Sequence, residues 1–111
     1  MAAKYEIKRA RNKQFYFNLK APNGEIILTS ETYKTRRGAK NGIQSVSKHG
    51  PNCLQYDMKM DRRKQYYFLL KSANHKIIGK SEPYTRAAKM EKGIQAVMKY
   101  ASKAKVHDLT S

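Results

Sequence analysis

The stretch FYFNLKAPNGEII at residues 15–27 recurs as YYFLLKSANHKII at residues 66–78. Working outward from these stretches, an offset of 51 residues aligns residues 4–35 with residues 55–86 without a gap. Farther along the chain, NGIQSVSK aligns with KGIQAVMK at the same offset. About twenty aligned positions are identical, which indicates two copies of one structural unit. We therefore predict internal repeats at residues 4–53 and 55–104.

Length and composition restrict the class of protein. The chain has 111 residues, of which 40% are apolar, and this predicts one folded domain spanning residues 1–111. No apolar run approaches the roughly 18 residues that a membrane helix needs, and the N-terminus lacks the apolar stretch of a secretory signal. Cys53 is the single cysteine, so an internal disulfide is excluded. We expect a cytoplasmic protein that does not bind a membrane.

Each copy has the pattern strand, strand, strand, helix. In the first copy, alternating apolar and polar residues predict strands at 5–9 and 14–21. Residues 25–30 are the expected third strand, and the adjacent Ile26 and Ile27 leave open which of its faces is buried. Pro22-Asn23-Gly24 is a turn sequence, and in the second copy Asn74 is expected to take the left-handed position. A helical spacing of apolar residues predicts a helix from about residue 36 to 48 and its counterpart in the second copy. Thr35 and Thr85 are the expected N-caps.

Two further features predict how the copies pack. Gly42 and Gly93 lie in the middle of the two helices, where glycine costs about 1 kcal/mol relative to alanine, so each helix is expected to approach the sheet closely there. His107-Asp108-Leu109 aligns with the start of both copies, which predicts a terminal strand at about residues 104–109. Such a strand needs backbone partners, and we expect it to pair with the first copy.

The predicted fold class is α+β. Two βββα repeats form one pseudo-twofold, mostly antiparallel sheet with two helices packed on one face and with exchanged C-terminal strands. Neither copy is long enough to enclose a large core alone, so the core is expected to be shared between them. Its expected members are Phe15, Phe17, Leu19, Ile43, Val46, Tyr66, Phe68, Leu70, Ile94 and Val97. Because the copies complete each other, we expect a monomer.

The doubled motif also resembles a known family. FYFNLKAPNGEII, SETY and NGIQSV, recurring as YYFLLKSANHKII, SEPY and KGIQAV, are similar to the YegP-like family of small bacterial proteins, over roughly residues 4–109. The resemblance implies strand-strand-strand-helix-strand units that form a single sheet by exchanging C-terminal strands. It implies no catalytic motif and no established biochemical role. This chain is much more basic than the resemblance leads us to expect.

The sequence contains few groupings that could support catalysis. His49, His75 and His107 have no companions at metal-ligand spacing, so neither a metal nor a cofactor is expected. Cys53 lacks a neighbouring base and is expected to be a buried or half-buried thiol. With no phosphate-binding loop and no nucleophile motif, we predict no catalytic residues and no enzyme.

The basic residues are the strongest functional feature. Lys and Arg number 24 against 8 Asp and Glu, which leaves a net charge of +16. Residues 1–53 carry 11 basic and 3 acidic groups, and residues 54–111 carry 13 and 5. Each half is therefore +8, so the charge belongs to the repeat and not to a tail. Basic turns follow the first strand of each copy, and a tyrosine and a lysine share the outer face of each second strand, an arrangement that can stack bases and hold phosphates. The candidate nucleic-acid-binding residues are Arg9, Arg11, Lys13, Tyr16, Lys20, Arg62, Arg63, Lys64, Tyr67 and Lys71.

Two functions remain open at this point. The first is a protein-interaction or structural module with an unknown protein partner, because a high net charge supports solubility as readily as binding. The alternative is sequence-tolerant binding of RNA, DNA or another polyanion through the basic turns and the Tyr/Lys face. The segment KQFYFNLK lacks the glycine-bearing pattern of a common RNA-binding motif, so no specific nucleic acid is indicated.

Overall fold

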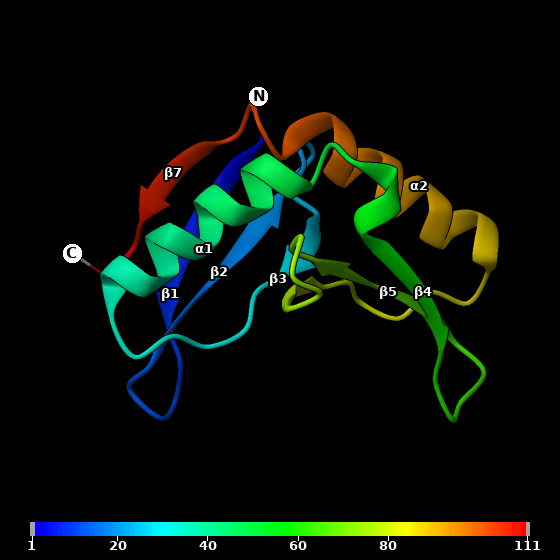
Figure 1. The fold of residues 1–111 in the computed structure, drawn as a ribbon, viewed down its shortest axis with the longest axis horizontal. Coiled ribbons are helices and arrows are strands. Elements are labelled where there is room, and N and C mark those ends of the chain that lie inside the picture. Colours follow the sequence, from blue (N-terminus) through cyan, green and yellow to red (C-terminus); the bar gives the residue numbers. More distant parts are fainter. Residues whose placement is uncertain (1, 111) are drawn as a thin grey trace.

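A computed structural model describes residues 2–110 of the chain. Its seven strands form one sheet in the order β4-β5-β6-β3-β2-β1-β7, and two helices pack on it (Figure 1). The first copy supplies β1 (Lys4–Arg9), β2 (Phe15–Lys20), β3 (Ile26–Thr29) and α1 (Arg36–His49). A short 3-10 turn (Cys53–Gln55) leads into the second copy, which supplies β4 (Tyr56–Met60), β5 (Tyr66–Lys71), β6 (Ile77–Lys80) and α2 (Ala87–Tyr100). The terminal strand β7 (Lys105–Asp108) follows the second copy.

The strand order has an approximate twofold axis between its two halves. β1, β2 and β3 pair antiparallel in sequence, as do β4, β5 and β6, and the halves meet where Thr29 of β3 lies opposite Lys80 of β6. The terminal strand β7 pairs parallel with β1, which confirms that the tail joins the first copy. The predicted α+β fold with exchanged strands is therefore present.

One continuous core joins the two copies. α1 packs on β2 of its own copy and on β6 of the other, and α2 packs on β5 and β3 in the same way. Every predicted core residue is buried except Tyr66, which is half-buried and packs against the core. The sequence prediction omitted Tyr5 and Ile7, which β7 helps to bury by covering the edge of β1.

The glycines in the two helices do mark close approaches to the sheet. A Cβ atom on Gly42 would overlap the hydroxyl of Tyr33, and a Cβ on Gly93 would overlap the hydroxyl of Tyr84. Both glycines are buried against these rings. Glycine at both equivalent positions is therefore a packing requirement that outweighs its poor helix propensity.

Two tyrosines tie each copy to the helix of the other. The Tyr5 hydroxyl donates to the carbonyl of Ala101 at the end of α2, and the Tyr56 hydroxyl donates to the carbonyl of Gly50 at 2.7 Å, at the end of α1. Burial raises the pKa of both phenols, so they act as hydrogen-bond donors. These equivalent contacts connect the first strand of each copy to a helix terminus.

Three local predictions need correction. The left-handed residue of the β5–β6 turn is His75 (φ 67°) and not Asn74, because His75 is the residue that aligns with Gly24. Thr35 caps α1 through its side chain, but α2 begins after Arg86 without a side-chain cap, so Thr85 is not an N-cap. Cys53 is exposed and not buried, because it lies in the 3-10 turn outside the core.

Candidate functional site

The face of the sheet opposite the helices is an open surface made from both copies. Because side chains alternate along a strand, the residues between the buried positions of β1 and β2 all point to this face. The register places Lys4 opposite Lys20 and Lys8 opposite Tyr16. In the second copy Lys59 lies opposite Tyr67. We call this surface the open face.

One cross-strand row runs across the open face through all seven strands. Each member lies directly opposite the next in the register of the sheet. The row consists of Asp57, Leu69, Lys80, Thr29, Asn18, Glu6 and His107. Polar residues dominate it, and the amide of Asn18 donates to the hydroxyl of Thr29 at 2.9 Å. The row therefore gives the open face a floor that is polar except at Leu69.

A carboxylate in each copy organises the neighbouring lysines. The Glu6 carboxylate lies 2.8 Å from the Lys20 ammonium, 3.4 Å from that of Lys4 and 3.8 Å from that of Lys8. Hydrogen bonding from Lys20 holds the pKa of Glu6 below its usual range, and the lysine charges lower it further. Three lysines around one carboxylate leave a local excess of positive charge at fixed positions.

Asp57 has the equivalent role in the second copy. Its carboxylate lies 3.1 Å from the Lys71 ammonium and 3.5 Å from that of Lys59. Hydrogen bonding from Lys71 lowers the pKa of Asp57 from its ordinary value. The arrangement on β1 and β2 is thus repeated on β4 and β5 by the approximate twofold axis.

The expected tyrosine–lysine pairs are formed differently. Lys20 and Lys71 were predicted to lie with Tyr16 and Tyr67, but both lysines turn toward the carboxylates. The ammonium of Lys80 lies 4.8 Å from the centre of the Tyr67 ring instead. Lys71 is four positions from Tyr67 along β5, whereas Lys80 lies on the neighbouring strand β6 and is near enough to contact the Tyr67 ring. Such a contact between strands can be predicted only once the register of the sheet is known.

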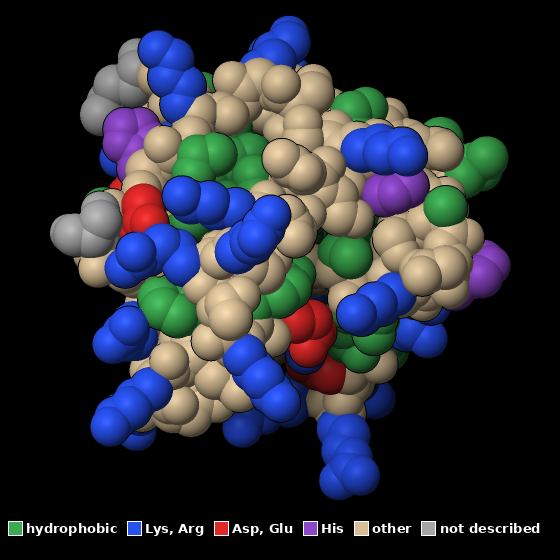
Figure 2. All heavy atoms as spheres, turned by 60° about the vertical axis from the view of Figure 1, so that its left-hand side comes forward, with side chains coloured by type: hydrophobic (Ala, Val, Ile, Leu, Met, Phe, Trp, Pro, Cys, Tyr) green, Lys and Arg blue, Asp and Glu red, His purple; other side chains and the backbone are tan. Residues whose placement is uncertain are grey.

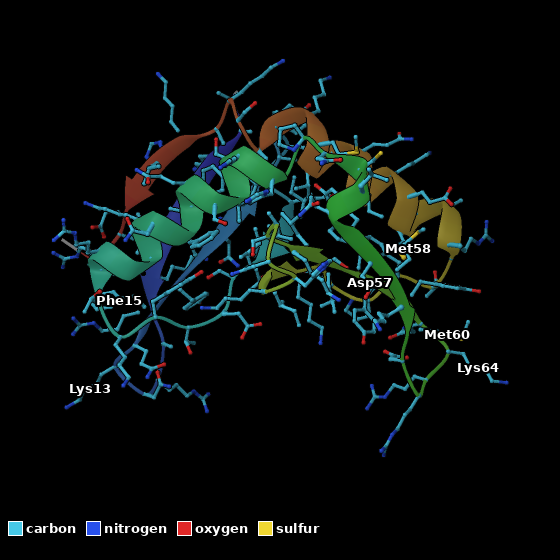
Figure 3. The ribbon with its side chains drawn as sticks, in the orientation of Figure 1. Lys13, Phe15, Asp57, Met58, Met60 and Lys64 are labelled. Carbon is cyan, nitrogen blue, oxygen red and sulfur yellow. The ribbon has the colours of Figure 1, made fainter. Side chains whose placement is uncertain are left out.

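The two basic hairpin tips project from the same side of the molecule (Figure 3). Arg11 and Lys13 lie in the β1–β2 tip, and Arg62, Arg63 and Lys64 lie in the β4–β5 tip; all are exposed. Lys13 and Lys64 adopt positive φ angles of 65° and 62°. Each tip thus holds a lysine in the left-handed conformation at its turn.

Arg9 does not belong with the other candidates. Its guanidinium lies 4.9 Å from the centre of the Phe15 ring, and Phe15 is a core residue on the helix side of the sheet. The structure therefore separates Arg9 from the open face.

The lysines on the open face that were not predicted from the sequence are Lys4, Lys8, Lys59, Lys80 and Lys105. The alternation of side chains along β1 was enough to place Lys4 and Lys8 on the open face. Placing Lys80 and Lys105 there also requires the order of the strands in the sheet.

Charge is not confined to the open face. On the side drawn in Figure 2, Lys and Arg side chains are spread over the surface and few carboxylates lie among them. A site cannot therefore be assigned from charge density alone. What distinguishes the open face is the combination of ordered lysines with tyrosines on an uncovered sheet.

Other polar groups of residues 2–110 line two grooves beside the helices. His49, His75 and Glu31 line a groove of about 1060 Å³ between α1 and the β5–β6 turn. An equivalent groove of about 960 Å³, lined by Glu82 and Tyr84, lies beside α2. Within residues 2–110 no cluster of three or more His, Cys, Asp or Glu could hold a metal ion. The helices between those limits are also too short and polar to cross a bilayer.

Comparison with known proteins decides the family. The family model described as a domain of unknown function, DUF1508, matches residues 10–57 and again residues 61–108. The chain belongs to this family. It is 47% identical to the UPF0339 protein YegP of Yersinia pestis over 106 residues, which cover 96% of this chain and 95% of the relative. The resemblance to YegP-like proteins noted from the sequence is thus confirmed.

Solved structures support the same assignment. The solution NMR structure of a UPF0339 protein from Shewanella oneidensis has a TM-score of 0.90 and 43% identity, covering 98% of this chain and 92% of its own. The solution NMR structure of YegP from E. coli, described as a protein of unknown function, has a TM-score of 0.91 and 41% identity, covering 98% and 94%. The family is thus uncharacterised and its tandem fold is known.

Proposed function

We propose that this protein is a non-enzymatic, monomeric cytoplasmic module that binds single-stranded nucleic acid on the open face, with little sequence preference. The observation that carries the proposal is a lysine opposite a tyrosine in each copy of the uncovered sheet. Lys8, ion-paired with Glu6, lies opposite Tyr16, and Lys59, ion-paired with Asp57, lies opposite Tyr67. Single-stranded nucleic acids are bound by surfaces of this kind, which combine aromatic rings for stacking with cations for phosphates.

The ion pairs support binding because they fix the lysines in advance. A free lysine side chain loses rotamer entropy when it binds a phosphate, and this loss is smaller when a carboxylate already holds the ammonium. Lys4, Lys8 and Lys20 share one carboxylate, so each retains donors for a further oxygen. The hairpin tips extend the positive surface beyond the ends of the strands.

Titration of a fluorescein-labelled oligo-U with increasing salt tests this proposal. If about six phosphates are bound, log affinity falls with log salt at a slope of about −4 for a single strand. Changing the tip residues Arg62, Arg63 and Lys64 to alanine should weaken binding. The slope should then become shallower by about 0.7 for each phosphate that the variant no longer neutralises.

A matched variant separates a site from general charge. Lys89, Lys92 and Lys103 are exposed outside the open face and the tips. Changing all three to alanine removes as many positive charges as the tip variant does. We expect this variant to bind nearly as well as the wild type. Equal reductions in affinity in the two variants, or no binding of the wild type at about 50 mM salt, would contradict the proposal.

A further inference from the structure

The two outer positions of the sheet are not equivalent. β1 is covered on its outer edge by β7, whereas its counterpart β4 ends the sheet with no strand beside it among residues 2–110. Under the approximate twofold axis, β7 corresponds to an empty position next to β4. An uncovered edge presents unpaired backbone N–H and C=O groups, which can accept a strand from another chain.

Burial differs at equivalent residues because of this missing strand. Ile7 on β1 is 0% exposed, while the aligned Met58 on β4 is 58% exposed. Ala3 is 6% exposed, while the aligned Leu54 is 84% exposed. Met60, next along the same side of β4, is also exposed (Figure 3). The position beside β4 is therefore lined by apolar side chains that a strand would cover.

The flanking helix shows which residues an incoming strand should carry. Where β7 lies, Arg36 of α1 forms an ion pair with Asp108 at 3.2 Å and donates to Thr110. The α2 residues aligned with Arg36 and Lys40 are Ala87 and Glu91. At these two aligned positions α2 therefore presents a methyl group and a carboxylate where α1 presents two cations, which favours an apolar side chain over an acidic one.

We propose that the outer edge of β4 binds an extended segment of another protein as a strand parallel to β4. The register of β7 supplies the template: its residues Val106 and Asp108 lie beside Tyr5 and Ile7. The incoming strand carries apolar residues at the two corresponding positions, beside Tyr56 and Met58. Exposed methionines suit such a site because their side chains adapt to different apolar partners.

Charge defines the rest of the partner. A parallel strand continues past Met60 toward the β4–β5 tip, where Arg62, Arg63 and Lys64 are exposed. Acidic residues on the C-terminal side of the apolar pair would meet these cations. A second copy of this chain is a poorer occupant, because both molecules would carry +16. The partner is therefore an acidic peptide segment with an apolar pair two residues apart.

Selection from a displayed library of random octapeptides tests the inference. Peptides enriched on the intact protein should carry two apolar residues separated by one position and followed by acidic residues. Binding of the best peptide is then measured by fluorescence anisotropy against Met58→Pro. The carbonyl of the aligned Ile7 accepts from the Leu109 amide at 3.0 Å, so the Met58 N–H points to the free edge and its removal spares the β4–β5 pairing.

We expect Met58→Pro to weaken peptide binding at least about tenfold, the consequence of blocking strand addition at this edge. A double variant, Met58→Gln with Met60→Gln, removes the apolar surface without adding a charge and should give the same result if Met58→Pro does not fold. Val106→Gln on the opposite edge strand is the matched control and should bind normally. The inference would be overturned if no peptide of this pattern is enriched, or if the β4 variants bind the peptide as well as the wild type does. Self-association of the protein that is abolished by Met58→Pro would also overturn it.

Discussion

At the scale of single residues, lysine holds a position in each hairpin tip where glycine would be more stable. Lys13 and Lys64 have φ angles of 65° and 62°, a left-handed conformation that side chains with a Cβ disfavour by about 1 kcal/mol or more. The β2–β3 turn uses Gly24 for the same conformation. A charged residue retained at both tips despite this strain fits a role in binding.

Changing Lys64 to glycine should therefore stabilise the protein and weaken nucleic-acid binding together. The relief of the left-handed conformation is expected to contribute about 1 kcal/mol to the free energy of unfolding. Chemical denaturation measures the first effect, and titration with the oligo-U measures the second. Lys64→Ala separates them, since it removes the charge without relieving the backbone. Unchanged binding in both variants would exclude Lys64 from the site.

The lysines around Glu6 predict a pH dependence of stability. Because the pKa of Glu6 is lowered on folding, the unfolded chain takes up its proton first as the pH falls. Stability from this group is present above the unfolded pKa of about 4 and is lost as the pH falls through the lower folded value. Glu6→Gln lacks this contribution at every pH. The difference in the free energy of unfolding between this variant and the wild type should therefore be smallest in strong acid. A difference that grows on acidification would contradict the assignment.

At the scale of elements, the helices were predictable because their packing repeats in both copies. Gly42 and Gly93 at equivalent positions indicated a close approach before any partner was known, and Tyr33 and Tyr84 prove to be the partners. The start of α2 was less predictable. Arg86 stands where the first copy has its capping Thr35, so the nearby Thr85 was misleading.

Gly42→Ala tests the packing of α1. Alanine favours the helix by about 1 kcal/mol, but its methyl group would displace the Tyr33 ring against Phe17, and overpacking costs about 1–3 kcal/mol. We expect a net loss of stability by thermal denaturation. Combining it with Tyr33→Leu, which removes the hydroxyl, should recover part of that loss. Stabilisation by Gly42→Ala alone would refute the close approach.

At the scale of the whole molecule, the repeat predicts the shared sheet but not its unequal edges. An offset of 51 residues relates the two copies and also places the start of a third at His107, so β7 could be assigned to the first copy. Which lysines gather on the open face depends on strand order. Lys80 reaches Tyr67 from β6, and no spacing within one strand indicates that contact.

The two surfaces proposed for binding lie on different parts of the sheet. The open face belongs to one side of the sheet, while the free edge of β4 lies at one end of the strand order. Nucleic acid and an acidic peptide would compete only near the β4–β5 tip, which borders both. The two copies thus both contribute to the open face, whereas the free edge of β4 belongs to the second copy alone.

The most direct test of the central claim is the amide NMR spectrum of the ¹⁵N-labelled protein during titration with oligo-U. The account predicts shifts concentrated on open-face residues of both copies, with Lys8, Tyr16, Lys59 and Tyr67 among them, and little change along α1 and α2. Shifts that follow the helices, or that spread evenly over every exposed lysine, would show that the ordered lysines and tyrosines do not form the binding surface.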